Sequence, residues 1–453
     1  MIKMKKSRAA ILLAVMVSVT LIFCLSACSV TGEDENKGEI YFLNFKPEVA
    51  EVYEEIARKY KEETGVTVKV VTAAANTYEQ TLKSEIAKSD APTIFQVNGP
   101  IGYSAWKDYC ADMSESKLYE YLSDKSLAIK SGNGVYGIPY VVEGYGIIYN
   151  EEITDKYFAL SGRNNSIASM DEVDTFAELK AVVEDMTARL SELGIAGVFA
   201  STSLKPGDDW RWQTHLANLP VYYEFRDNKT DLTDSTVTKL NFTYGDNYKN
   251  IFDLYILNSV TEPGKLGTKL VSDSMSEFAL GQCAMVQNGT WAWNDIKGVA
   301  GNTVKSDKIK MLPIYMGVDG EEKQGLCIGT ENYLAVNSQV SADKQKMSFE
   351  FLDWLFSSDT GKKYVTDKLG FTTPFSTFKD NEIPGDPLAK EVKRYMSDGK
   401  TENVSWVFTV FPGSVFKENF GAALLRYAQG KINFDEVKKT VKESWERESS
   451  LLK

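Results

Sequence analysis

From residue 39 onward, the chain alternates short apolar runs with amphipathic segments. Apolar side chains recur every three or four positions after Pro47, and Gly65 follows this stretch, which is typical of a helix that ends at a glycine. The elements expected in this part are a strand over 39–45, a helix over 47–64, a strand over 66–71, a helix over 77–88 and a strand over 92–97. This order predicts a mainly parallel sheet with helices on its faces, and therefore an α/β fold.

The same alternation returns later in the chain. Thr175 and Glu178 have the spacing of a capping box ahead of a helical pattern that Gly194 closes, and Ser274 and Glu277 have the same spacing before a shorter helix. The other expected elements are strands over 195–200 and 283–287 and helices over 341–356, 360–369, 418–425 and 435–448. The later part of the chain is therefore also expected to be α/β.

The first 28 residues have the pattern of a leader sequence. Residues 1–8 hold four basic side chains and no acidic one, residues 9–23 are almost entirely apolar, and Leu25-Ser26-Ala27-Cys28 follows. A basic start, an apolar stretch and small residues before a cleavage point predict a signal peptide, with a retained transmembrane anchor as the alternative. Residues 29–38 are polar without apolar periodicity, which favours a flexible tether.

Composition limits the classes of function. The chain has 453 residues, of which 43% are hydrophobic and 25% charged, and this suits a folded protein of two or three domains or one two-lobed body. Lys and Arg number 51 against 63 Asp and Glu, a formal net charge of −12, and an anionic surface argues against a nucleic-acid partner. The single histidine, His215, excludes metal sites that need two histidines, and we expect no metal ion.

No catalytic or cofactor motif withstands inspection. Residues 132–137 match the GxGxxG pattern, but they lead into a strand-like run with no helix after it, so we interpret them as a hairpin turn. We therefore expect neither a cofactor nor enzymatic activity. The five cysteines are too few for a disulfide scaffold; for Cys110, Cys283 and Cys327 we favour free buried thiols, with one disulfide as the alternative.

Aromatic residues beside polar ones, at the ends of predicted strands, are the main clue to binding. In open α/β sheets, ligands bind beyond the carboxyl ends of the strands. A sugar ring presents an apolar face that a flat aromatic side chain covers, and a belt of hydroxyls that amide, carboxylate and guanidinium groups bind. The candidates in such places are Asn44, Gln96, Asn98, Glu143, Tyr145, Asp208, Asp209, Trp210, Arg211, Trp291 and Trp293.

Several segments together resemble a known family. Leu25-Ser26-Ala27-Cys28 resembles the lipobox of bacterial lipoproteins, in which the cysteine is lipidated and becomes the first residue. Residues 39–71, which begin EIYFLNFKPEVAEVYEEIARKY, resemble the opening of the extracellular solute-binding proteins of bacterial ABC importers, in the carbohydrate family that includes maltose-binding protein. Further likenesses to this family lie, in the family's order, in residues 90–96, 136–150, 278–293 and 342–375.

The resemblance implies the type II periplasmic-binding-protein fold, with two α/β lobes that close on a ligand, each a mainly parallel sheet flanked by helices. The implied division is a signal peptide over 1–27, lipidated Cys28 and a tether over 28–38, lobe 1 over 39–145 and 311–370, and lobe 2 over 146–310 and 371–453. The chain crossings are expected near Gly144–Asn150, Met311–Tyr315 and Gly370–Phe375.

The matched motifs also imply roles for single residues. Trp291 would be the platform on which a sugar stacks, with Trp293 as second choice, and Glu143 would contact sugar from the first crossing. Asn44, Gln96 and Asn98 would act from loops of lobe 1, and Asp208, Asp209, Trp210 and Arg211 from a loop of lobe 2.

The implied function is capture of an oligosaccharide and its delivery to the permease subunits of an ABC importer, with no chemistry on the sugar. A neutral sugar is ranked ahead of an acidic one, because Arg211 is the single suggestive arginine. We expect a monomer, held by lipid at Cys28 on the outer face of the cell membrane of a Gram-positive bacterium. A surface glycoside hydrolase and a carbohydrate-binding adhesin are the alternatives, since both would share the aromatic cleft.

Overall fold

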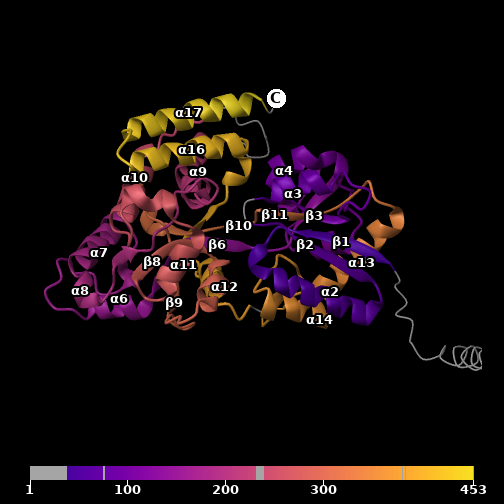
Figure 1. Cartoon of the computed structure of the whole chain (residues 1–453), viewed down its shortest axis with the longest axis horizontal. Helices are drawn as coiled ribbons and strands as arrows, with labels where there is room; N and C mark the ends of the chain where they lie inside the picture. Colours follow the sequence, from indigo (N-terminus) through magenta and orange to yellow (C-terminus); the bar gives the residue numbers. More distant parts are fainter. Residues whose placement is uncertain (1–37, 75–76, 231–238, 380, 383, 452–453) are drawn as a thin grey trace, which may run out of the picture.

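The computed structural model shows two lobes side by side (Figure 1). It describes residues 38–451 apart from 75, 76, 231–238, 380 and 383. The expected signal peptide, Cys28 and all of the tether except Gly38 therefore lie outside the described residues. The described chain begins at the outer end of lobe 1, on the side away from lobe 2 (Figure 1).

Lobe 1 is built on a six-stranded sheet in the order β2-β1-β3-β11-β5-β4. Its strands are β1 (Glu39–Asn44), β2 (Thr67–Thr72), β3 (Ile94–Asn98), β4 (Ile129–Ser131), β5 (Gly134–Pro139) and β11 (Asn332–Val336). Its helices are α2 (Ala50–Thr64), α3 (Tyr78–Glu85), α4 (Gly99–Trp106), α5 (Lys117–Tyr121), α13 (Ala342–Ser357) and α14 (Asp359–Lys363). The expected alternation at the start of the chain is confirmed, because β1 pairs in parallel with both β2 and β3.

Both faces of this sheet are buried. Ile40 and Phe42 of β1 pack in a cluster that includes residues of α2 and α13, whereas Tyr41 and Leu43 pack in a second cluster on the opposite face. Gly65 ends α2 with a φ of 81°, a left-handed conformation that glycine adopts without steric penalty. Because helices and loops cover the faces, ligand-binding groups of this lobe must come from the strand ends.

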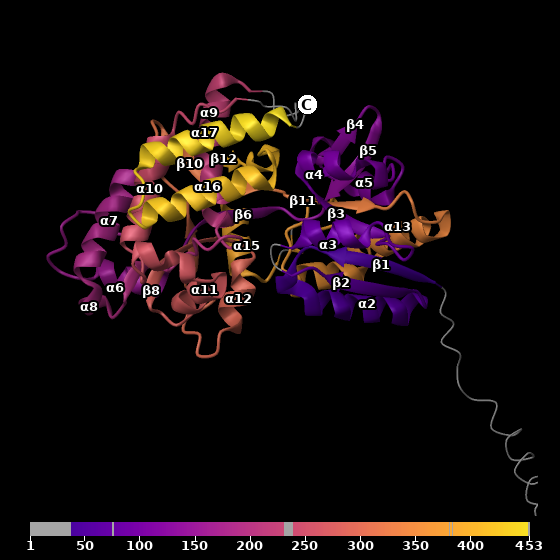
Figure 2. The same ribbon diagram turned by 45° about the horizontal axis from the view of Figure 1, so that its top comes forward.

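Lobe 2 holds the second sheet, with strands in the order β12-β10-β6-β8-β7 and β9 paired to β6. Its strands are β6 (Glu143–Asn150), β7 (Gly197–Phe199), β8 (Cys283–Gly289), β9 (Ile309–Leu312), β10 (Gln324–Gly329) and β12 (Glu402–Ser405). Its helices are α6 (Glu151–Phe158), α7 (Phe176–Ala188), α8 (Leu190–Leu193), α9 (Ala217–Asn228), α10 (Gly245–Leu257), α11 (Val271–Ala279), α12 (Ala292–Gly298), α15 (Pro387–Ser397), α16 (Gly413–Ala428) and α17 (Phe434–Ser450). The last two helices, expected from the sequence, pack side by side across the lobe (Figure 2).

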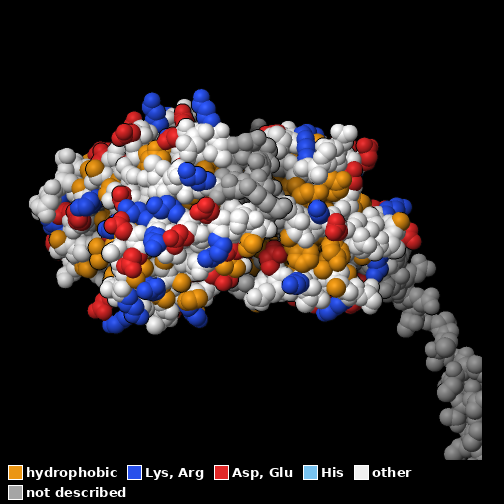
Figure 3. All heavy atoms as spheres, turned by 90° about the horizontal axis from the view of Figure 1, so that it is seen from above, with side chains coloured by type: hydrophobic (Ala, Val, Ile, Leu, Met, Phe, Trp, Pro, Cys, Tyr) orange, Lys and Arg blue, Asp and Glu red, His pale blue; other side chains and the backbone are white. Residues whose placement is uncertain are grey.

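The surface of the two lobes differs in character. Seen from above, charged side chains of both signs are interspersed over lobe 2, while hydrophobic side chains gather on lobe 1 (Figure 3). The face in this view does not carry the single-sign basic patch that is typical of nucleic-acid-binding proteins. Within the described ranges, no helix combines the length and apolar character needed to cross a membrane.

The expectation of mainly parallel sheets is wrong, because both sheets are mixed. In lobe 1, β11 runs antiparallel to β3 and β5, and in lobe 2, β6 runs antiparallel to β8, β9 and β10. A helix between two strands lets them run in parallel, whereas strands joined by a hairpin, or arriving from the other lobe, enter in the reverse direction. The sequence pattern predicts the βα units, but it does not predict which strands from later in the chain pair antiparallel with them.

The chain crosses between the lobes at positions other than those expected. The first crossing is residues 140–142, because β5 lies in the first sheet and β6, which contains Gly144–Asn150, lies entirely in the second. The return crossing is residues 330–331 rather than Met311–Tyr315, because β9 and β10 both pair within the second sheet.

The third crossing follows Gly370–Phe375 instead of coinciding with it. Thr372 pairs with Val142, and Phe375 pairs with Leu122 of lobe 1. The next helix, α15, packs on β6 and β9 of lobe 2. The expected boundaries at 145, 311 and 370 are therefore corrected to about 142, 330 and 382, because strand pairing and side-chain contacts over long sequence separations set them.

One of the two expected capping boxes is confirmed. The backbone N–H of Thr175 donates to the Glu178 carboxylate at 3.1 Å, and the N–H of Glu178 donates to the Thr175 hydroxyl at 3.4 Å. The second expected box is wrong, because α11 begins at Val271 and Ser274 therefore lies inside the helix. At the actual start of α11, Asp273 accepts a 2.8 Å hydrogen bond from the N–H of Leu270. Glu277 does not cap the helix; its carboxylate accepts a 2.6 Å hydrogen bond from the N–H of Ser201.

The hairpin and the free thiols are confirmed. Residues 132–133 form the turn between β4 and β5, which pair antiparallel, so the GxGxxG match has no phosphate-binding helix after it. Cys110, Cys283 and Cys327 are buried and unbonded to one another.

Candidate functional site

A small cavity lies between the lobes, next to the crossings. Its volume is about 20 Å³, which accommodates about one water molecule. Residues of both lobes line it, among them Glu48, Val49, Glu143, Thr290, Trp291, Asn294, Phe371 and Thr372. The lobes also touch where α4 meets the turn Phe408–Val410, since a Cβ on Gly99 would lie 2.8 Å from the Thr409 Cβ.

A buried ion pair joins lobe 1 to the first strand of lobe 2. The Lys46 Nζ lies 2.8 and 2.9 Å from the two carboxylate oxygens of Glu143, and 3.6 Å from Glu48. Burial alone would lower the pKa of Lys46, but Glu143 and Glu48 outweigh it and hold the pKa above its ordinary value. Glu143, expected to contact sugar, is thus at the cavity, but Lys46 already engages both of its oxygens.

Six side chains of lobe 2 pack together in what we call the aromatic wall: Tyr145, Trp210, His215, Trp291, Trp406 and Phe408. The His215 ring is its centre, with centroids 4.7 Å from Trp210 and 5.4 Å from Trp291. The Trp210 and Trp291 rings lie 5.9 Å apart. These two are half-buried while the other four are buried, so Trp210 and Trp291 have ring surface to offer a ligand.

His215 is neutral at neutral pH. Burial, and then the nearby charge of Arg211, lowers its pKa to about 3. The histidine therefore packs as an aromatic ring in the wall and adds no positive charge to the site.

The wall is held by a buried π-helical segment, Arg211–Leu216. Such segments lack the regular α-helical hydrogen bonds, and here side chains satisfy the backbone carbonyls. Gln287 donates to the carbonyl of Arg211 at 3.0 Å, and the hydroxyls of Tyr248 and Tyr145 donate to the carbonyls of Trp212 and His215 at 3.1 and 2.9 Å.

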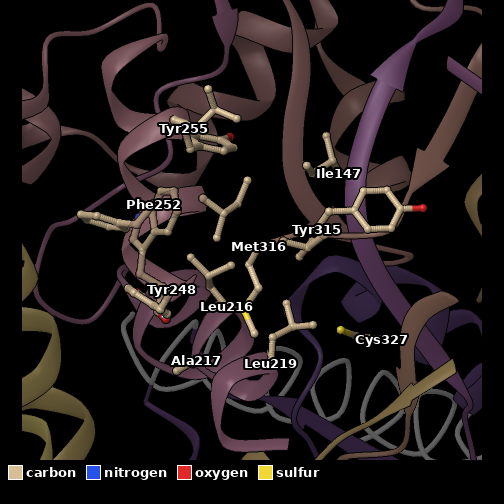
Figure 4. Packing of buried hydrophobic residues seen from close by; sticks show 14 of the residues in the cluster. Ile147, Leu216, Ala217, Leu219, Tyr248, Phe252, Tyr255, Tyr315, Met316 and Cys327 are labelled. Atoms are coloured by element: carbon tan, nitrogen blue, oxygen red, sulfur yellow. The ribbon is translucent and has the colours of Figure 1, made fainter. Parts of the chain in front are cut away.

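Below this segment lies the main hydrophobic cluster of lobe 2. Leu216 points into it, among Tyr248, Phe252 and Tyr255 from α10 (Figure 4). The Trp212 ring packs edge-on against Phe252 and Tyr255 at 5.0 and 4.9 Å. The residues that carry the site are therefore placed on a rigid support.

Several buried polar atoms around the wall make no hydrogen bond within the protein. They include the Arg211 Nε and Nη1, both ring nitrogens of His215, the indole Nε1 of Trp291 and of Trp406, and the Thr290 hydroxyl. Arg211 is 2% exposed, and its guanidinium carbon lies 4.0 Å from the centroid of the Trp210 ring. Burial lowers the pKa of Arg211 to about 10, which still leaves the side chain charged at neutral pH.

Two of the expected lobe 1 contacts have structural roles instead. The Asn44 amide donates to the Lys46 carbonyl and the Thr72 hydroxyl at 2.8 and 3.1 Å and accepts from the Lys46 N–H, so it stabilises the turn after β1. Gln96 is fully buried; its amide donates to the Tyr140 hydroxyl at 2.7 Å and its oxygen accepts from the Phe45 N–H. We therefore leave both side chains out of the candidate site.

Asn98 lies at the junction of the lobes. Its amide donates at 2.7 Å to Glu331, which occupies the return crossing. Burial raises the pKa of Glu331, with Lys417 of α16 opposing that effect. Asn98 thus orients an acidic group that faces lobe 2.

The remaining candidates divide between the wall and the core. Tyr145 is buried in the wall, whereas Trp293 packs outside it against the cluster around α11 and α12. Asp208 and Asp209 share the loop before Trp210. Asp209 packs against Gly421 of α16, where a Cβ would lie 1.8 Å from its carboxylate, and burial raises its pKa to about 6.

The sequence analysis missed Trp406 and Phe408. Both follow the short strand β12, so the signal that singled out the other candidates, aromatic residues just after a strand, was present there too. Trp406 packs on the backbone at Gly329, where a Cβ would lie 2.6 Å from its ring. A larger residue at this position of β10 would push Trp406 out of the wall.

A family model for bacterial extracellular solute-binding proteins matches residues 55–393. The chain belongs to this family. The match spans all three crossings and the loop of Trp210, while Lys46, Trp406 and Phe408 of the candidate site of this solute-binding protein lie outside the matched region.

Solved structures of two-lobed binding proteins are similar to it along nearly their whole length. A chitin oligosaccharide binding protein has a TM-score of 0.69 at 16% identity, covering 91% of this chain and 99% of that chain. A sugar transporter protein from Bacillus licheniformis in complex with stachyose has a TM-score of 0.65 at 16% identity, covering 90% and 100%. Maltose-bound MalE3 from T. maritima has a TM-score of 0.66 at 15% identity, covering 90% and 99%. These likenesses confirm the expected two-lobed type II fold.

The site offers groups that can bind a ligand. Within the part of the chain that the structure describes, no three His, Cys, Asp or Glu side chains come together in a group that could hold a metal ion. The side chains at the cavity include the Trp291 ring, the Thr290 hydroxyl, Glu143 with its ion pair to Lys46, and the carboxylates of Glu48 and Asp386. Family and neighbouring structures are likewise binding proteins.

Proposed function

We propose that this solute-binding protein captures an oligosaccharide between its lobes and delivers it, unreacted, to the membrane subunits of an ABC importer. The observation that carries the proposal is the pair of half-buried rings, Trp291, which lines the interlobe cavity, and Trp210, whose ring lies 5.9 Å from it. Flat rings cover the apolar faces of sugars, and the donors around them bind hydroxyl oxygens. The similar structures with stachyose and maltose, named for those sugars, support this ligand class.

Binding requires the lobes to move apart and close again. The cavity of about 20 Å³ is far smaller than the roughly 300–1,000 Å³ of pockets that hold ligands of this size. A saccharide therefore enters an open form, and its contacts to both lobes are complete only after closure. The three crossings are the segments about which the lobes can turn.

The proposed lipid anchor at Cys28 is compatible with this movement. The described chain starts at the outer end of lobe 1, away from the cavity (Figure 1). A tether from that point would hold the protein at the outer face of the membrane and leave the cleft free. We propose that the protein acts there as a monomer; replacing Cys28 with Ala should release it from cells into the medium, as measured by immunoblotting of the two fractions.

A thermal-shift panel of di-, tri- and tetrasaccharides tests the proposed function. A ligand that binds only the native state raises the melting temperature by mass action. The best ligand should then reduce the radius of gyration in X-ray scattering, because the lobes close on it. If no saccharide raises the melting temperature, or if scattering is unchanged at saturation, the proposal is wrong.

The same samples separate the two alternatives. A glycoside hydrolase would return shortened sugars with new reducing ends, whereas mass spectrometry after a long incubation should recover the ligand intact. An adhesin would bind sugar without becoming more compact.

A further inference from the structure

Among the described residues, three positively charged side chains are buried, and two of them have a carboxylate partner. Among the described residues, the buried Lys and Arg side chains are Lys46, Arg211 and Lys362. Lys46 pairs with Glu143 at 2.8 Å, and Lys362 pairs with Glu382 at 2.9 Å. Within the same described residues, Arg211 has no carboxylate oxygen at ion-pair distance, and two of its nitrogens have no hydrogen-bond acceptor.

A buried arginine without a partner is unfavourable unless a ligand supplies the missing hydrogen-bond acceptors and negative charge. A buried charge without a partner has lost its hydration and gained nothing in return. The nearby acidic groups, Asp208 and Asp295, act on Arg211 only through longer-range attraction, and burial still dominates. The π-helical segment and its support hold Arg211 in this position, so it cannot relax toward solvent without disrupting the core.

Arg211 lies next to the candidate site and not in the lining of its cavity. Its guanidinium carbon is 4.0 Å from the centroid of the Trp210 ring, and Trp210 is the ring next to Trp291. The other unpartnered groups of this corner include the indole N–H of Trp291, the indole N–H of Trp406, the Thr290 hydroxyl and both ring nitrogens of His215. The guanidinium and the two indoles can only donate hydrogen bonds, the hydroxyl can donate as well, and the neutral imidazole of His215 has one donor and one acceptor.

A corner in which donors outnumber acceptors around a cation suits a group that only accepts. Sugar hydroxyls donate as well as accept, and each would need an acceptor in return. A carboxylate accepts only, carries the opposite charge, and forms stronger, charge-assisted hydrogen bonds with a guanidinium.

We propose that Arg211 binds a carboxylate of the ligand, so that this protein imports an acidic oligosaccharide containing a uronic acid residue. This inference rests on the proposed function and narrows its ligand class. It replaces the preference for a neutral sugar, which was based on the number of candidate arginines and not on their partners.

The test uses pairs of ligands that differ in the carboxylate. Binding of trigalacturonic acid is compared by calorimetry with binding of the corresponding α-1,4-linked galactotriose, and binding of glucuronoxylotriose with binding of xylotriose. In at least one pair the acidic member should bind about 100-fold more tightly, the scale of a charge-assisted pair of hydrogen bonds. Equal or tighter binding of the neutral member in both pairs overturns the proposal.

Variants at Arg211 assign the preference to this side chain. Arg211→Gln should remove the preference for the acidic member by lowering its affinity far more than that of the neutral member, and Arg211→Lys should retain part of the preference. Lys362→Gln, a buried cation in lobe 1 away from the site, is the matched control and should leave the preference unchanged. A loss shared equally by both members of a pair would show a structural role for Arg211 instead. Circular dichroism checks that the variants fold, and the wild-type comparison decides the ligand class without them.

The outcome also separates this inference from the proposed function. If neutral saccharides bind and no acidic one does at up to about 1 mM, the inference fails and the proposed function stands. If no saccharide of either kind binds in the full panel, the proposed function fails as well.

Discussion

At the scale of the residue, Trp291 is the side chain on which binding is expected to depend most. Replacing Trp291 with Ala removes one of the two half-buried rings of the aromatic wall and should weaken saccharide binding by about 1–3 kcal/mol, the range for aromatic platforms that stack on flat ligands. Calorimetry with the best ligand of the panel measures the loss.

Trp354→Ala provides the control, because Trp354 is a half-buried tryptophan of α13 on lobe 1 that donates to Glu63 and lies outside the cavity. This variant should keep wild-type affinity. If Trp291→Ala also keeps it, Trp291 does not contact the ligand.

His215 links the stability of lobe 2 to pH. Burial lowers its pKa to about 3 in the folded protein, whereas the unfolded chain has the ordinary value of 6.5. The unfolded state therefore binds the extra proton below pH 6.5, and stability falls as the pH decreases from about 6.5 toward about 3. Between pH 7 and pH 5, this single group should lower the free energy of unfolding by about 2 kcal/mol.

The measurement is urea unfolding of the wild type and of His215→Gln at both pH values. The loss on acidification should be smaller in the variant by that amount. Asp209, whose pKa is raised to about 6, changes stability in the opposite direction, but it is present in both proteins and cancels in the comparison. Equal losses in the two proteins would show that His215 is protonated in the fold.

At the scale of the element, the capping box of α7 is the clearest local determinant. Thr175 and Glu178 satisfy two backbone N–H groups that the helix cannot. Thr175→Ala should therefore reduce the free energy of unfolding by about 1 kcal/mol, as measured by urea unfolding followed by circular dichroism. Ser276→Ala, at a half-buried position inside α11, should cause no loss because Ala favours helix interiors.

The π-helical segment Arg211–Leu216 is stabilised by residues from other elements. Its carbonyls are satisfied by Gln287, Tyr248 and Tyr145, which come from three other elements. No local pattern in the sequence predicts this conformation, because the partners that stabilise it are distant along the chain.

At the scale of the whole molecule, the ion pair of Lys46 with Glu143 ties the lobes together. Glu143→Gln leaves the buried Lys46 with only the longer contact to Glu48, and should cost about 3 kcal/mol of unfolding free energy. The melting temperature and urea midpoint report this loss. Glu152→Gln, which removes the partner of Lys305 at the exposed end of α6, should leave both unchanged.

If Glu143→Gln is as stable as the wild type, the ion pair forms without contributing to stability and the lobes are joined by the backbone crossings alone. In that case the contacts between α4 and Thr409 would be the next candidates for stabilising the closed arrangement of the lobes.

The amino-acid sequence by itself determined the local features: the first β-α-β-α-β run, the cap at Thr175, the helix ends at Gly65 and Gly194, and the positions of Trp210, Arg211 and Trp291 after strands. Each depends on residues within a few positions of one another, and propensity and periodicity read such patterns directly. Only the tertiary structure decided the lobe boundaries, the mixed sheets, the inward turn of Asn44 and Gln96, the addition of Trp406, and the missing partner of Arg211. These features depend on which strand or side chain from a distant part of the chain lies next to a residue. Burial and pairing across long sequence separations cannot be inferred from neighbouring residues in the chain.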